Sequence, residues 1–116
     1  MKIPLNKNQN MTDKIVVLST ASSTQEAEKI ARNLVDERLA ACVNVVPAMR
    51  SFYRWKGSIE DAAECLLVIK SSRGRFDALR TALEKLHSYE VPEVIALSVI
   101  DGAQNYLNWM DGELGA

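Results

Sequence analysis

The chain has 116 residues, with 14 Lys and Arg against 15 Asp and Glu, so its formal charge is −1 at pH 7. This length fits one ordinary domain and excludes a multidomain enzyme. The near-neutral charge argues against a nucleic-acid partner held by a large basic field, and 47% hydrophobic residues are enough to build a core.

The composition also indicates a compartment. Two cysteines, Cys42 and Cys65, are too few for a secreted disulfide framework. No segment approaches the roughly 20 apolar residues of a membrane span, and the start of the chain lacks a signal-peptide pattern. We therefore expect a cytoplasmic protein with no membrane partner, in which residues 1–12 form a flexible N-terminal tail and 13–116 a single domain.

The first half of the domain predicts a strand followed by a helix. Residues 14–20 are apolar and β-branched, as in a central strand. Ser23 and Glu26 have the spacing of a capping box, which marks the start of a helix. The apolar residues that follow recur at helical spacing: Ala27, Ile30, Ala31, Leu34 and Val35.

A long hairpin comes next. Residues 42–55 are largely strand formers with a bend expected at Pro47, and residues 62–70 return after a turn at 56–58. A strand of about 14 residues would span roughly 45 Å, whereas a domain of this size has a radius of gyration of about 13 Å. The hairpin must therefore bend or project, and we expect a second copy of the chain to cover its apolar residues, Phe52, Tyr53, Trp55 and Ile59.

The second half predicts a helix over 76–87, a strand over 94–100 and a short last helix over 103–114. The element order β-α-β-β-α-β with a terminal helix is that of an α+β, ferredoxin-like fold. In this fold an antiparallel sheet carries two helices on one face.

Four segments of the sequence resemble the divalent-cation tolerance protein family, CutA. They are LAACVNVVP at 39–47, SFYRWKG at 51–57, LHSYEVPE at 86–93 and YLNW at 106–109, and the resemblance covers about residues 14 to 114. It implies a ferredoxin-like subunit in a homotrimer whose assembly resembles that of the PII signalling proteins. It also implies a cytoplasmic protein linked to tolerance of copper and other divalent metals, with no established enzymatic reaction.

The resemblance bears on metal binding as well. Members credited with copper binding carry a cysteine at the position of Ser19 and adjacent histidines at the positions of Leu86 and His87, so this chain keeps only His87. We expect weak binding of Cu(II) or another divalent cation by His87, assisted by water, backbone or Glu90, and no tightly bound metal. The structural alternative is that His87 interacts with the end of its helix.

The placement of polar residues at strand ends and in loops suggests a site between subunits. Tyr53, Lys70, Glu90 and Tyr106 are the candidates for this cleft, and Phe52, Tyr53 and Trp55 are the candidates for the trimer interface. A structural network at the interface is the alternative for the four cleft residues. Lys70 and Arg73 are available for an anion if the protein is instead a PII-like sensor of small molecules.

Two further functions have partial support. Residues 49–56 interleave cations with aromatics, which is typical of single-stranded nucleic-acid binders, but no RNP-type motif follows. The fold also supports acylphosphatase-like hydrolysis, which needs a glycine-rich anion loop and an arginine, and residues 21–24 contain neither. We therefore expect no catalytic residue and no nucleic-acid partner.

Overall fold

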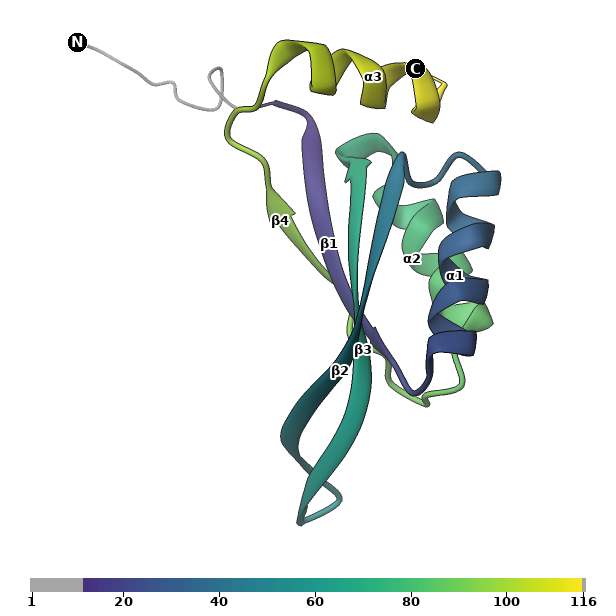
Figure 1. Ribbon diagram of the computed structural model, residues 1–116, viewed down its shortest axis with the longest axis vertical. Helices are drawn as coiled ribbons and strands as arrows, with labels where there is room; N and C mark the ends of the chain where they lie inside the picture. Colours follow the sequence, from purple (N-terminus) through teal and green to yellow (C-terminus); the bar gives the residue numbers. More distant parts are fainter. Residues whose placement is uncertain (1–11, 116) are drawn as a thin grey trace, which may run out of the picture.

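A computed structural model describes residues 12–115 and shows an antiparallel sheet with helices on one side (Figure 1). The strands run in the order β2-β3-β1-β4 across the sheet. Along the chain, α1 follows β1, α2 follows β3 and α3 follows β4, and a short 3₁₀ turn, η2, precedes α2. The elements are β1 (Lys14–Ala21), α1 (Thr24–Asp36), β2 (Cys42–Trp55), β3 (Ser58–Ser72), η2 (Arg73–Arg75), α2 (Phe76–Leu86), β4 (Ile95–Ser98) and α3 (Gln104–Leu114). The predicted α+β, ferredoxin-like arrangement is confirmed.

The core lies between the sheet and the pair α1 and α2. Alternate residues of β1 and β3, such as Val17 and Ile69, meet Leu34 of α1 and Leu79 and Leu83 of α2, and all five are fully buried. Side chains along a strand alternate between the two faces of a sheet. The residues of β1 and β3 that alternate with these core residues therefore point to the other side of the sheet.

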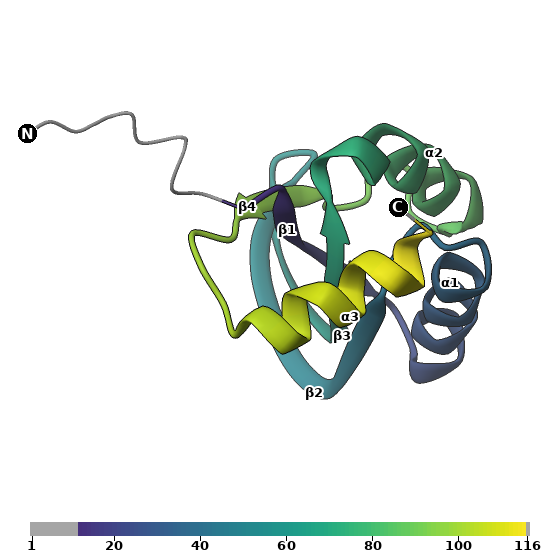
Figure 2. The same cartoon turned by 90° about the horizontal axis from the view of Figure 1, so that it is seen from above.

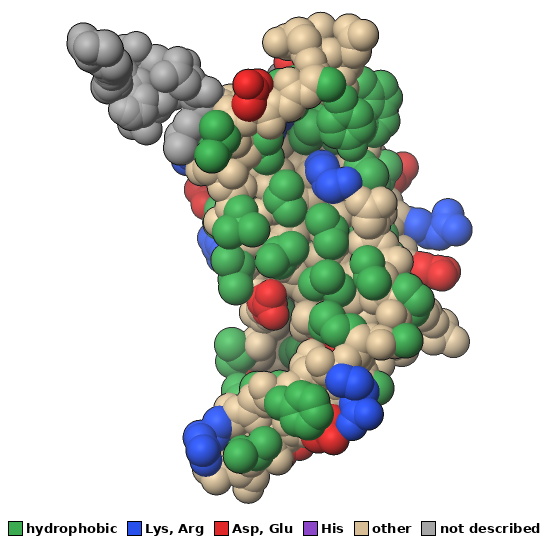
Figure 3. Space-filling model, turned by 60° about the vertical axis from the view of Figure 1, so that its left-hand side comes forward, with side chains coloured by type: hydrophobic (Ala, Val, Ile, Leu, Met, Phe, Trp, Pro, Cys, Tyr) green, Lys and Arg blue, Asp and Glu red, His purple; other side chains and the backbone are tan. Residues whose placement is uncertain are grey.

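This other side, the open sheet face, is mostly apolar and largely uncovered. The strand register places the residues of this face opposite one another on neighbouring strands. Figure 3 shows hydrophobic side chains gathered over this side of the molecule. The helix α3 crosses only one end of it, where Leu107, Met110 and Leu114 pack on Ala41 (Figure 2). The open sheet face consists of Val16, Leu18, Val46, Leu66, Val68, Ile95 and Leu97.

The β2–β3 hairpin projects beyond the layers as a twisted arm, as predicted from its length (Figure 1). The molecule measures 50 × 33 × 23 Å along its principal axes. The pairing register shifts between Val46 and Met49, around Pro47, and Ala48 there has a positive φ of 63°. Lys56 and Gly57 close the hairpin with φ of 49° and 86°, the pattern of a type I′ turn.

Three sequence predictions need correction at element ends. β3 begins at Ser58 rather than at residue 62, and β4 covers Ile95–Ser98 rather than 94–100. Most of the predicted tail, residues 1–11, lies outside the described residues. Thr12 belongs to the folded unit, because its hydroxyl donates to the Val99 carbonyl at 2.8 Å and accepts from the Lys14 N–H at 3.0 Å.

Candidate functional site

A pocket of about 700 Å³ lies where the arm meets the loop that precedes β4. The arm contributes three aromatic rings, Phe52, Tyr53 and Trp55, and the loop contributes Tyr89. Three carboxylates also line it: Glu64, Glu90 and Glu93. We call this cavity the acidic–aromatic pocket; its remaining lining residues are Thr20, Ser51, Ser88 and Val91.

Glu64 is the most deeply placed charge of this pocket. Its residue is 6% exposed, on β3 at the start of the arm, opposite Met49. The Tyr89 hydroxyl donates to its Oε2 at 2.6 Å. Burial, together with this carboxylate, raises the pKa of Tyr89 well above its ordinary value, so the hydroxyl remains a donor at neutral pH.

His87 fixes the loop on one side of the pocket. Its side chain is fully buried, its Nε2 lies 2.6 Å from the Thr20 carbonyl, and its Nδ1 accepts the Tyr89 N–H at 3.1 Å. A carbonyl can only accept and a backbone N–H can only donate. The hydrogen bonds therefore assign a neutral imidazole with its proton on Nε2.

Glu26 fixes the same loop from α1. Its Oε2 accepts the Ser88 N–H at 2.7 Å, and its Oε1 accepts the N–H and the hydroxyl of Ser22 at 3.1 and 2.9 Å. Burial by itself raises the pKa of Glu26, but the hydrogen bonds from Ser22 and Ser88 outweigh it and lower the pKa to about 2. We call Glu26 and His87 with their partners the loop latch.

The arrangement does not fit a copper ion at His87. Both ring nitrogens are already engaged, so neither offers a free lone pair without breaking a hydrogen bond. Ser19 is fully buried, and its hydroxyl has no hydrogen-bond partner within residues 12–115. Within residues 12–115, no three His, Cys, Asp or Glu side chains lie close enough to hold one metal ion. The assignment of His87 as a ligand therefore remains a prediction that the geometry does not support.

The four cleft residues predicted from sequence form two pairs in one chain rather than one group. Tyr53 and Glu90 line the acidic–aromatic pocket. Lys70 lies six residues further along β3 than Glu64, about 20 Å away at the usual rise per residue. There its Nζ is 2.5 Å from the Asn44 Oδ1 and 4.0 Å from the Cys42 sulfur.

Tyr106 belongs to this second pair. Tyr106 of α3 is a neighbour of the Cys42 thiol, and burial, followed by this thiol, raises the pKa of Tyr106 above its ordinary value. Cys42 is half-buried on the open side of the sheet, whereas Cys65 packs in the core. The two pairs lie at opposite ends of the open sheet face, so only contact between subunits would unite them.

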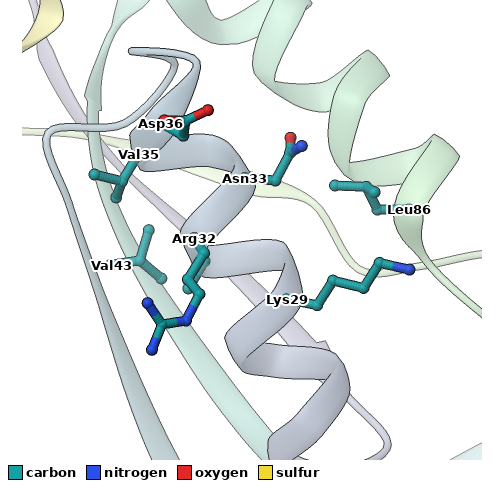
Figure 4. A pocket seen from close by; sticks show the side chains of 8 residues that line it. Lys29, Arg32, Asn33, Val35, Asp36, Val43 and Leu86 are labelled. Carbon is teal, nitrogen blue, oxygen red and sulfur yellow. The ribbon is translucent and has the colours of Figure 1, made fainter.

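A second, shallower cavity lies on the helix side. Figure 4 shows it between α1, Val43 of β2 and Leu86 of α2, with Lys29 and Arg32 extending in different directions. Its volume is about 680 Å³. Its charged side chains do not converge on a common point, so it carries less chemistry than the acidic–aromatic pocket.

Sequence reasoning did not identify Glu64, Tyr89 or Glu26 as site residues. A signal was present for Glu64, because a carboxylate interrupts the run of small and apolar residues at 62–69. The roles of Tyr89 and Glu26 depend on contacts between segments far apart in the chain, which no local pattern encodes.

Comparison with known proteins places this geometry in a family. The profile described as CutA1 divalent ion tolerance protein matches residues 15–113. The chain belongs to this family. The divalent-cation tolerance protein CutA of Thermus thermophilus is 44% identical over 100 residues, which cover 86% of this chain and 97% of that protein. The human protein CutA is 45% identical over 91 residues, 78% of this chain and 51% of its own length.

Solved CutA structures share the fold. The CutA structure from Xylella fastidiosa superimposes with a TM-score of 0.87 at 43% identity, covering 89% of this chain and 99% of that one. The structure of the periplasmic divalent cation tolerance protein CutA from Archaeoglobus fulgidus gives a TM-score of 0.85 at 36% identity, covering 87% of this chain and 98% of that one. The relatives also include a chloroplastic CutA from Arabidopsis thaliana, 37% identical over 93% of this chain and 59% of that protein. These CutA proteins therefore occur in more than one compartment. Within the described part of this chain, none of the helices has the length and apolar character needed to traverse a lipid bilayer.

Proposed function

We propose that this CutA-family chain works as a homotrimer in which neighbouring copies cover the open sheet face and the arm. The observation that carries the proposal is the exposed apolar surface: Phe52 is 67% exposed, Ile95 50% and Leu97 49%. A single subunit gains nothing from exposing these apolar side chains, whereas a second copy would remove them from water. Phe52, Tyr53 and Trp55 are the proposed interface residues of the arm.

Within this proposal the trimer takes part in tolerance of divalent cations, the role for which relatives such as the Thermus thermophilus CutA are named. Binding of Cu(II) is weak and uses exposed groups such as Glu90, because the His87 nitrogens are engaged. The cytoplasm is the proposed compartment, which the two free thiols support.

We propose no catalytic role for this fold. The position where an acylphosphatase-like enzyme would hold an anion, the start of α1, is filled by the protein's own groups. Ser23 caps the helix by accepting the Glu26 N–H at 3.1 Å, and the Glu26 carboxylate lies against Ser22. An entering anion would meet this negative charge.

Nucleic acid and simple anions are also poor partners for the described cations. Arg50 on the arm is paired with both oxygens of Asp61, which cancels its charge. Lys70 is bonded to Asn44 and Arg73 to Ser98, at opposite edges of the sheet. These contacts favour the trimeric cation-tolerance protein over a PII-like sensor of anions.

Two matched substitutions test the proposed interface. Leu97 is 49% exposed on the open sheet face and Val35 is 43% exposed on α1, outside it. Leu97→Asp should dissociate the trimer in native mass spectrometry, because the carboxylate would be buried without a partner. Val35→Asp should leave the mass unchanged. If the two variants have the same oligomeric mass in native mass spectrometry, the proposal is contradicted.

A further inference from the structure

We propose that the acidic–aromatic pocket binds an organic cation, an alkylammonium or guanidinium group, between the carboxylates of Glu64 and Glu90 and the aromatic rings of the arm. All of its lining residues come from one chain, and three of them, Phe52, Tyr53 and Trp55, are also proposed interface residues, so a neighbouring copy would border the pocket in the trimer. Its volume of about 700 Å³ lies within the range of small-molecule sites.

The first argument is the charge of Glu64. Its residue is 94% removed from solvent, as its 6% exposure shows, yet it forms no salt bridge with any described residue. Among the described residues, its one side-chain hydrogen bond comes from the neutral Tyr89 hydroxyl. None of the eleven lining residues is Lys, Arg or His. A carboxylate buried without a counter-ion is costly, and an entering cation would offset that cost.

The aromatic rings in the lining also favour a cation. Aromatic faces attract cations, and alkylammonium groups are recognised by cages of such rings. The arm's rings already do this outside the pocket: Lys56 Nζ lies 5.7 Å from the centre of the Trp55 ring and Arg50 lies 5.8 Å from that of Phe52. A lining that contains both carboxylates and aromatic rings therefore favours a cation with apolar parts over a neutral or anionic ligand.

The third argument separates an organic cation from a metal ion. Within residues 12–115, no three acidic, histidine or cysteine side chains are close enough to share one ion. Divalent cations need several oxygen ligands at about 2 to 2.6 Å. An organic cation needs no such set of ligands, because one carboxylate and an aromatic face are enough to hold it.

The cation has two possible sources, a free amine or a Lys or Arg side chain from a neighbouring copy, and we assign it to the free amine. All eleven lining residues come from one chain, so the site needs no residue of a neighbouring copy to be complete. Calorimetric titration with putrescine and agmatine, at low ionic strength, is the direct test. Butanediol is the neutral control ligand and glutarate is the anionic control ligand.

Both amines should bind the purified protein, and butanediol and glutarate should not. Glu64→Gln should weaken putrescine binding by at least about tenfold, because a hydrogen bond to a buried charge is lost. Glu90→Gln, at an exposed position, should weaken it less without affecting the fold. Glu28→Gln, on the solvent side of α1, is the matched control and should bind as the unsubstituted protein does.

Two results would overturn the proposal. Equal binding of butanediol and putrescine would show that charge is not recognised. No amine binding to the unsubstituted protein, with dissociation of its trimer on Glu64→Gln, would assign the cation to a neighbouring copy. Circular dichroism shows whether Glu64→Gln folds. If it does not, Glu90→Gln and Trp55→Leu test the site in its place. An unchanged affinity for the amines in both variants would contradict the proposed site.

Discussion

The carboxylate of Glu26 accepts a 2.7 Å hydrogen bond from the backbone N–H of Ser88 and so ties the first helix to the loop that walls the acidic–aromatic pocket. The same carboxylate accepts two hydrogen bonds from Ser22. One side chain therefore holds the start of α1 and the pocket wall in a fixed relation. This contact makes the loop latch a measurable contributor to stability.

The loop latch predicts a specific acid sensitivity. The pKa of Glu26 falls from 4.5 to about 2 on folding. A carboxyl with a lowered folded-state pKa stabilises the protein above 4.5, and that contribution disappears as the pH falls from 4.5 toward 2. Glu26→Gln should lower the free energy of unfolding by about 2 kcal/mol at neutral pH, since its amide cannot accept every hydrogen bond that the carboxylate accepts. Chemical denaturation across this pH range, at constant protein concentration, measures both effects.

Glu28→Gln is the control for that prediction, because Glu28 is exposed on the same helix. Its free energy of unfolding should equal that of the unsubstituted protein at every pH. The difference between the unsubstituted protein and Glu26→Gln should shrink as Glu26 becomes protonated. A difference that stays constant down to the lowest pH would show that Glu26 does not titrate as the loop latch requires.

Two buried serines predict opposite effects of the same substitution. Ser19 and Ser71 are both 0% exposed, but the Ser19 hydroxyl has no partner among the residues that the structure describes, while the Ser71 hydroxyl donates to the Leu39 carbonyl at 2.6 Å. Ser19→Ala should stabilise the protein by about 1 kcal/mol, and Ser71→Ala should destabilise it by about 1 kcal/mol. Urea unfolding of the three proteins tests the pair. Destabilisation by Ser19→Ala would mean that its hydroxyl has a partner in solution.

The position of His87 predicts stability loss rather than loss of metal. His87→Ala removes both hydrogen bonds of a fully buried ring and should cost about 3 kcal/mol. Its affinity for Cu(II), measured by calorimetry at neutral pH, should equal that of the unsubstituted protein. A clear weakening of Cu(II) binding in a folded variant would restore His87 as a ligand, as the sequence predicts.

The arm aromatic Trp55 reports on assembly. It is 37% exposed in the single chain, so a contact with a neighbouring copy would bury what remains. Trp55→Ala should cost about 3 to 5 kcal/mol per subunit if the ring is enclosed at the interface, and Trp55→Phe should cost less. Thermal melting at two protein concentrations checks this. An unchanged melting temperature in Trp55→Ala would place the ring in solvent.

Much of the fold is encoded locally, and the site is not. The capping box at Ser23 and the apolar spacing after it define α1, and the hairpin's length requires the projecting arm. The extension of β3 to Ser58 escaped prediction because residues 58–61 are mostly polar and gain strand structure only by pairing with β2. β4 is short because only Ile95 to Ser98 pair with β1.

The functional residues depend on tertiary contacts. The spacing of His87 marks a helix end, but the Thr20 carbonyl and the Tyr89 N–H that engage its nitrogens come from β1 and a loop. Tyr53 and Glu90 share a pocket, whereas Lys70 and Tyr106 lie at the other end of the sheet. Local patterns identify such residues individually, and the sheet register decides which of them meet.

The central claim is that copies of this chain cover the open sheet face. Sedimentation equilibrium of the unsubstituted protein over a range of micromolar concentrations tests it most directly. The account predicts one species with three times the 12.9 kDa mass of the chain. A species of 12.9 kDa persisting across that range would contradict it, because the apolar face would then remain in water.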